Sequence, residues 1–194
     1  MKTHQIHITE ERIKVLTELI GKEVYILFAP NLSISTEENI MTSSYFNMNF
    51  LSRNKLGINT SKVFKFRTKP FEENDIDFYK IEFAIKKEEK QLKDNFDQYV
   101  FQNLNSIISF APSSKIDKIQ VLNYKYVFNS ENPNFENTEV DYDDGILFFQ
   151  ENGKRFLFSC YHSLTEESEF IRDEKSIKKR IKELKVRKEI KNVG

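Results

Sequence analysis

The spacing of apolar residues changes along the chain and separates helical from extended segments. Between residues 10 and 20 the apolar side chains recur on one helical face, with Thr9 and Gly21 at positions where a helix cap and a helix stop are favoured. This spacing predicts a helix over 10–20. The apolar run at 22–29 follows immediately and predicts a strand.

Three later segments alternate between apolar and polar residues, which is the pattern of strands with one buried face. They cover residues 44–51, 61–67 and 77–86. Because short polar loops join them, we expect an antiparallel meander. Residues 117–128 predict a further strand.

Two other segments show the period of a helix. Apolar residues at intervals of three and four predict an amphipathic helix over residues 90–109. A last helix is predicted over residues 164–190, because Ser163 to Glu166 match a capping box and an apolar stripe follows. This C-terminal helix is basic and amphipathic, and we expect it to pack on the sheet or on a partner.

Residues 145–162 contain the strongest local signal, an Asn152-Gly153 pair between two apolar runs. This pair favours a two-residue type I′ hairpin turn, which would place Phe149 opposite Phe156. Both faces of the hairpin are apolar, so we expect it in the middle of the sheet.

Together these segments predict a single α+β domain spanning residues 1–194. We expect a mainly antiparallel sheet of about seven strands with three helices packed against it. The chain is long enough to bury a sizeable core, and 18 phenylalanines and 8 tyrosines supply large apolar side chains for it.

Charge is sorted along the chain, although 30 basic and 30 acidic residues give a net charge of zero. Residues 131–151 carry seven acidic and no basic side chains. The asparagines and proline between 129 and 137 predict an irregular acidic loop between the strand over 117–128 and the hairpin. Residues 175–191 carry nine basic and two acidic side chains. The basic segment can bind phosphate, an acidic partner, or the acidic segment of the same chain.

The composition also bears on the cellular setting. A single cysteine, Cys160, excludes an internal disulfide framework and fits a reducing cytoplasm. The start of the chain lacks the apolar core of a secretory signal, and no apolar run approaches the ~20 residues of a membrane span. We therefore expect a soluble cytoplasmic protein without a membrane association. The residue usage is consistent with an AT-rich bacterial or phage genome.

Signatures of catalysis and cofactor binding are sparse. With five glycines, the chain has no glycine-rich phosphate loop, nucleophile elbow or Cys-x-x-Cys pair, so we expect neither a cofactor nor a bound metal. The predicted hairpin register sets His162 opposite Asp143 and near Cys160. This group can support nucleophilic catalysis, but a buried thiol and a histidine paired with an aspartate explain the same residues.

The leading functional hypothesis is a non-enzymatic protein-binding module, such as an inhibitor or immunity-type protein of a bacterial conflict system. Its acidic loop would meet a protein partner with a basic surface. The residues that would make this contact are Glu139, Asp141, Asp143 and Asp144.

Two alternatives remain open. One is a nucleic-acid-binding protein whose C-terminal helix contacts phosphates. Its contact residues would be Lys178, Lys179, Lys182 and Lys185. The other is a metal-dependent hydrolase that uses the turn from Asp141 to Asp144. The oligomeric state does not follow from the sequence.

Overall fold

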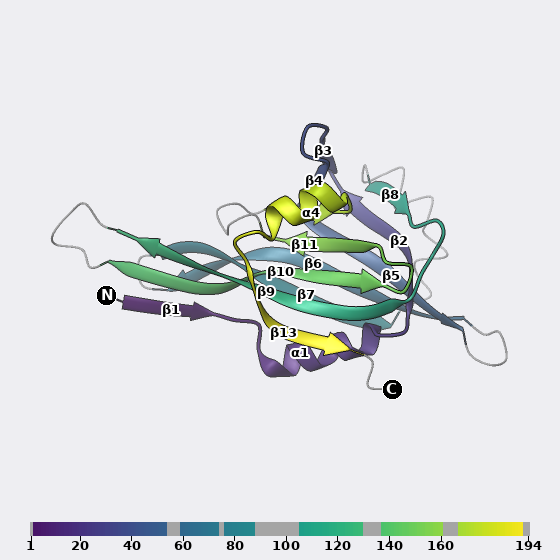
Figure 1. Cartoon of the computed structure of the whole chain (residues 1–194), viewed down its shortest axis with the longest axis horizontal. Helices are drawn as coiled ribbons and strands as arrows, with labels where there is room; N and C mark the ends of the chain where they lie inside the picture. Colours follow the sequence, from purple (N-terminus) through teal and green to yellow (C-terminus); the bar gives the residue numbers. More distant parts are fainter. Residues whose placement is uncertain are drawn as a thin grey trace.

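Two β-sheets pack face to face in the computed structural model of the protein (Figure 1). The structure describes residues 2–53, 59–73, 76–87, 105–129, 137–160 and 167–191. Within these ranges thirteen strands form an eight-stranded sheet, here called sheet A, and a five-stranded sheet, called sheet B.

Sheet A has the strand order β13-β9-β10-β11-β12-β4-β3, and β1 lies parallel to β10 beside this path. Its strands are β1 (Lys2–Ile6), β3 (Ser33–Ser35), β4 (Ile40–Ser43), β9 (Ile116–Phe128), β10 (Thr138–Gln150), β11 (Arg155–Ser159), β12 (Ser168–Ile171) and β13 (Lys185–Lys191). The β10–β11 hairpin lies in the middle of sheet A, as its two apolar faces predict.

Sheet B has the order β7-β6-β5-β2-β8. Its strands are β2 (Glu23–Pro30), β5 (Tyr45–Arg53), β6 (Asn59–Glu73), β7 (Ile76–Lys87) and β8 (Asn105–Ser109). The antiparallel β5-β6-β7 meander confirms the prediction from the alternating pattern. Only Ser44 separates β4 from β5, so the chain passes directly from sheet A into sheet B.

Phenylalanine side chains fill the space between the two sheets. Phe46, Phe64 and Phe66 of sheet B are fully buried, as are Phe148 and Phe158 of sheet A. Ring centroids lie 5.1 Å apart for Phe66 and Phe158 and 5.6 Å apart for Phe64 and Phe148, within the range of favourable aromatic pairs. Alternation in each strand therefore delivers one apolar face to a shared core.

Helices cover the outside of this sandwich. Helix α1 (Glu10–Leu16) continues into the 3-10 helix η1 (Thr17–Leu19), which confirms the predicted helix over 10–20. The Thr9 side chain accepts a hydrogen bond from the Arg12 backbone N–H, and Gly21 takes the positive φ expected after a helix.

The second α-helix of the described residues, α4 (Glu174–Arg180), packs on the outer face of sheet A. Its buried Ile177 contacts a small apolar cluster. The other buried members of this cluster are Leu122, Leu147, Leu157 and Ile171. No helix in the described part of the chain is long and apolar enough to cross a membrane.

The predicted fold class, seven strands with three helices, is wrong. Strands dominate the described residues, and the helices there are short. In the predicted helix over 164–190, the described residues instead form β12, the two-turn helix α4 and β13, and residues 164–166 lie outside the described residues. β12 pairs with β11 and β4, and β13 pairs with β9, so sheet pairing outweighs the helical spacing. In the predicted helix over 90–109, residues 105–109 are β8, and residues 90–104 lie outside the described residues.

The register of the central hairpin differs from the prediction by one residue. Phe148, not Phe149, pairs with Phe156, and their rings stack with centroids 4.8 Å apart. The Gly153 N–H donates to the carbonyl oxygen of Gln150 at 2.9 Å, and Gly153 has a φ of +79°. The loop therefore has three residues and a glycine bulge, whereas a type I′ turn needs positive φ at two positions.

Candidate functional site

The described part of the predicted acidic loop is mostly strand β10, and the carboxylates of Asp141, Asp143 and Asp144 are buried. Residues 130–136 lie outside the described residues. Glu139, Asp141, Asp143 and Asp144 lie on β10. The pairing of β10 with β9 shifts between Asp143 and Gly145, which makes Asp144 an extra residue in the strand. Such a bulge changes the direction of neighbouring side chains, so the aspartates reach different partners.

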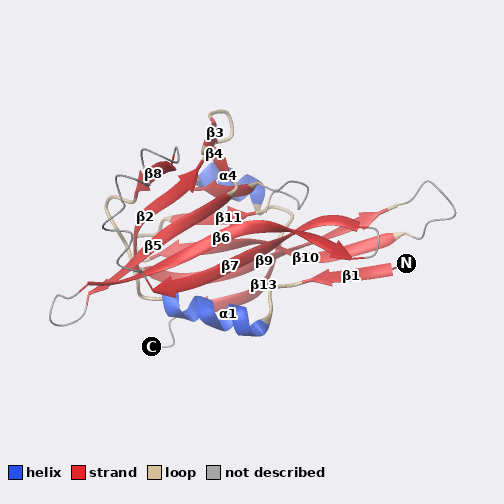
Figure 2. Ribbon diagram, turned by 180° about the vertical axis from the view of Figure 1, so that it is seen from behind, coloured by secondary structure: helices blue, strands red, loops and turns tan. Residues whose placement is uncertain are grey.

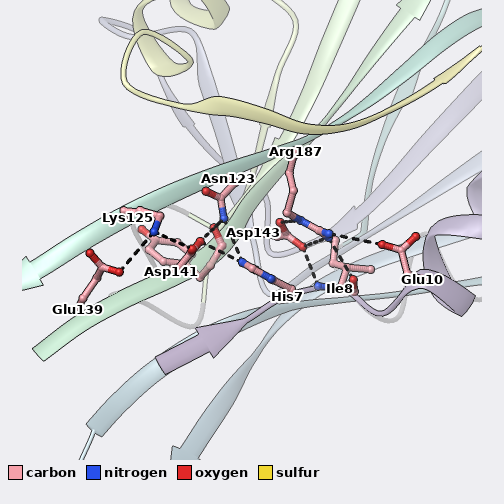
Figure 3. Close-up of polar contacts among 10 residues, drawn as sticks. His7, Ile8, Glu10, Asn123, Lys125, Glu139, Asp141, Asp143 and Arg187 are labelled. Carbon is pink, nitrogen blue, oxygen red and sulfur yellow. Dashed lines mark hydrogen bonds and ion pairs between the residues drawn. The ribbon is translucent and has the colours of Figure 1, made fainter. Parts of the chain in front are cut away.

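Asp141 is bound by three side chains on one side of β10 (Figure 3). The Asn123 side-chain amide donates to Oδ1 at 2.7 Å, and His7 Nε2 lies 3.0 Å from the same oxygen. Lys125 Nζ lies 3.1 Å from Oδ2, and it also reaches Glu139. Burial alone would raise the pKa of Asp141, but these partners outweigh it and lower the pKa to about 2.

Asp143 joins three separate parts of the chain (Figure 3). Arg187 of β13 donates to both carboxylate oxygens, at 2.7 and 2.6 Å, and the Ile8 backbone N–H donates at 2.7 Å. Arg187 also donates to the Ile8 carbonyl oxygen at 3.1 Å. The hydrogen bonds with Asp143 raise the pKa of Arg187. This bidentate pair ties β13 and the segment before α1 to β10.

Asp144 is completely buried and forms a second ion-pair group. Arg180, at the end of α4, lies 2.9 Å from Asp144 Oδ2 and 3.2 Å from Glu169 Oε2. It also donates to Ser159 Oγ at 2.7 Å. Burial raises the pKa of Glu169 although Arg180 opposes this effect. One guanidinium therefore pairs with two carboxylates inside the protein, and these three side chains carry a formal charge of −1 when both carboxyl groups are ionised.

These contacts explain the sorted charges. The basic C-terminal segment supplies Arg180 and Arg187 to the aspartates of the acidic segment, which is one of the three pairings that the sequence allows. The side chains of Asp143 and Asp144 are 1% and 0% exposed, and that of Asp141 is 11% exposed. A partner-binding role for them stays a prediction, but they have little free surface to offer.

The possible nucleophilic group is not assembled in the described part of the chain. Cys160 is fully buried, and its Sγ lies 3.6 Å from Asp144 Oδ1 rather than beside Asp143. His162 lies outside the described residues. Among the described residues no group of three histidine, cysteine or acidic side chains is arranged to hold a metal ion.

Sequence reasoning did not identify the residues that complete the two ion-pair groups. His7 and Asn123 carry no local signal, since each lies more than fifteen positions from Asp141. Arg180 and Arg187 stand out only as members of the basic segment. The opposite charges of the acidic and basic segments were the signal available in the sequence. They indicate that the two segments can pair, but they do not specify which side chains form each ion pair.

The lysines of the nucleic-acid hypothesis lie on three different elements. Lys178 and Lys179 are exposed on α4 and pair with Glu174 at 3.5 Å and Glu38 at 2.8 Å. Lys182 is exposed in the turn after α4, and Lys185 is exposed at the start of β13. The continuous basic helix that would have aligned these lysines is absent.

A hollow of about 660 Å³ opens between α4, the turn after it and the β3–β4 turn. Ser176 Oγ donates to the Glu38 carbonyl oxygen at 2.5 Å and thereby connects α4 to that turn. The hollow has basic, acidic and apolar lining residues. They are Glu37, Glu38, Asn39, Ile40, Asp173, Lys175, Ser176, Lys179, Arg180, Lys182, Glu183 and Leu184.

Comparison with known proteins adds no family to this description. The chain matches no family model, no curated protein and no solved structure.

Proposed function

We propose that the protein is a non-enzymatic protein-binding module whose partner docks in the hollow beside α4. One observation supports this proposal most directly: side chains of both charges and apolar side chains line the same hollow. Its volume of about 660 Å³ is in the range of ~300–1,000 Å³ typical of ligand sites.

The mixed charge favours a protein segment over a nucleic acid. Glu37, Glu38 and Glu183 line the hollow together with the lysines, and they would repel a phosphate backbone. A peptide segment can present carboxylates to Lys182 and basic groups to the glutamates. Ile40 and Leu184 add the apolar surface that protein interfaces place near their centre.

The proposal keeps the setting inferred from the sequence. An inhibitor or immunity-type protein of a bacterial conflict system needs a binding surface rather than a catalytic group. The single cysteine supports a cytoplasmic location. The sequence predicts a partner with a basic surface, whereas this hollow fits a partner that carries both charges.

Site-specific photo-crosslinking in the native host would test the proposal. A photoreactive phenylalanine analogue replaces Lys182 in one variant and Tyr126, an exposed residue of β9, in a matched control. We expect a discrete protein adduct from position 182 that survives nuclease and is missing from the control. A nuclease-sensitive adduct, or none at all, would contradict the proposal.

A further inference from the structure

Figure 2 shows the face of sheet B that points away from sheet A, with β6 and β7 side by side. The outward positions of these two strands carry a row of cations. Because Phe64 and Phe66 are fully buried, alternation turns Lys65, Arg67 and Lys69 of β6 outward. Their partners across the ladder are Ala84, Glu82 and Lys80 of β7. This basic face lies on the opposite side of the sandwich from α4.

A hollow of about 250 Å³ lies within this face. Arg12 of α1, Lys65, Arg67 and Lys86 line it with their positive charges, and Glu82 is the one carboxylate among its lining residues. The remaining lining residues are Phe83 and Ala84. Four cations and one carboxylate give the hollow a formal charge of +3.

Contacts within the protein hold these cations in place. Arg67 Nε donates to Glu82 Oε2 at 2.6 Å, Lys69 Nζ lies 3.1 Å from the same oxygen, and Arg12 lies 3.8 Å from Oε1. Partial burial alone would raise the pKa of Glu82, but Lys69 and Arg67 outweigh it and lower the pKa. Lys65 lies over the Tyr45 ring, 4.7 Å from its centroid.

We propose that this basic face binds the phosphate backbone of single-stranded nucleic acid. The hollow is smaller than the ~300 Å³ at which sites for drug-sized ligands begin, so it suits one phosphate group. Outward residues of a strand follow one another at ~6.6 Å, so Lys65, Arg67 and Lys69 continue the site as a row for successive phosphates. The inference is independent of the hollow beside α4.

The composition of this face favours nucleic acid over an acidic protein. Lysine is depleted at the centre of protein interfaces, which are built around aromatic and aliphatic anchors. Here Lys65 and Lys86 supply two of the four cations, and the exposed apolar side chain in the hollow is the small Ala84, so its lining offers no exposed aromatic or large aliphatic anchor. A flexible single strand can bring successive phosphates to the row of cations along β6, whose outward residues are ~6.6 Å apart.

Fluorescence anisotropy with a labelled oligothymidylate tests the proposal. For the parent protein, the logarithm of the binding constant should fall linearly with the logarithm of salt concentration, by about 0.7 for each phosphate contacted. Four contacts would give a slope of roughly −3. Lys65→Glu with Lys86→Glu should weaken binding at least about tenfold and flatten the slope by roughly 1.4.

A matched control reverses the same number of charges on the other side of the sandwich. Lys178→Glu with Lys185→Glu, two exposed residues outside the hollow beside α4, should leave oligothymidylate binding close to that of the parent. If the double variant Lys65→Glu with Lys86→Glu fails to fold, Lys65→Gln with Lys86→Gln removes the same two charges. It should also weaken oligothymidylate binding and flatten the salt dependence. Thermal melts establish that each variant is folded.

Three results would overturn the proposal. They are no binding by the parent at ~50 mM salt, equal losses in the test and control variants, and binding of a duplex as tight as that of the single strand. An excess of polyglutamate that displaces the oligonucleotide at equal charge would instead assign the face to an acidic protein. None of these results bears on the crosslinking experiment at position 182.

Discussion

Removal of the Arg180 guanidinium should strongly destabilise the protein. Arg180→Met keeps most of the side-chain volume and the helical propensity of α4 but removes the cation shared by Asp144 and Glu169. The arginine side chain is 8% exposed and the two carboxylates are 0% and 3% exposed, so water cannot replace it. Both carboxylates would remain buried without a positive partner.

The expected cost is about 3–5 kcal/mol at pH 7, the usual range for breaking a buried ion pair by removing one member. That is a large part of the ~5–15 kcal/mol by which an ordinary domain is stable. The variant can reduce this cost by protonating Glu169, whose pKa burial already raises in the parent. Protonation costs about 1.4 kcal/mol for each pH unit above the pKa, so the deficit should shrink as pH falls from 8 to 5.

Urea unfolding of parent and variant at several pH values between 5 and 8 measures this deficit. Lys179→Met is the matched control. The Lys179 side chain, next to Arg180 in the sequence, is 78% exposed, and its ion pair with Glu38 lies at the surface. The control should lose less than about 1 kcal/mol at every pH. Equal losses in the two variants, or a deficit of Arg180→Met that does not change with pH, would refute the reasoning.

Three further predictions test the core and the acidic strand. Asp141→Asn should lower the unfolding free energy at pH 7, and the difference from the parent should vanish between about pH 4 and 2. Because the pKa of Asp141 is lowered in the folded state, its ion pairs stabilise the fold above the unfolded pKa of 3.8 and are lost as the carboxylate protonates. Urea titrations at each pH measure this difference. Phe148→Ala should lower the unfolding free energy by about 3–5 kcal/mol and Phe149→Ala by clearly less, because Phe148 is fully buried whereas Phe149 is partly buried beneath Lys118. Equal urea midpoints for the two variants would mean that the hairpin register is wrong. In thermal melts Gly153→Val should be less stable than Gly153→Asn, because asparagine tolerates positive φ and a β-branched residue does not, and the reverse order would contradict the three-residue loop.

The alternating pattern by itself located much of the sheet structure. The alternating segments at 44–51, 61–67 and 77–86 are strands, because a side-chain period of two is compatible with a half-buried strand and not with a helix. The apolar run at 22–29 and the segment at 117–128 are strands as well, as predicted. The same pattern indicated the antiparallel meander. The helix cap at Thr9 was also readable, since it depends on bonds within one turn.

Hairpin register was decided by tertiary packing. An Asn-Gly pair favours two turn types of different length, and a difference of one residue exchanges the two faces of a strand. Phe148 and Phe156 enter the core between the sheets, and Leu147 and Leu157 face α4. Both faces are apolar, so alternation cannot choose between the two registers.

The candidate sites were the least accessible to sequence reasoning, because they depend on contacts between distant segments. In the sequence, the acidic residues of β10 have the composition of a solvated loop. In the structure, β9, β13 and α4 supply partners for their carboxylates. The basic face of sheet B requires the pairing of β6 with β7, which brings together lysines that are separated along the chain.

The C-terminal segment shows the same limit for secondary structure. Its apolar residues recur at helical spacing, yet among its described residues only 174–180 form an α-helix. β12 and β13 instead satisfy their backbone groups by pairing with β11, β4 and β9, and Phe170 gains complete burial in the aromatic core. Local spacing determined which side chains share a face, whereas long-range hydrogen bonding and burial of large side chains decided which backbone conformation the segment adopts.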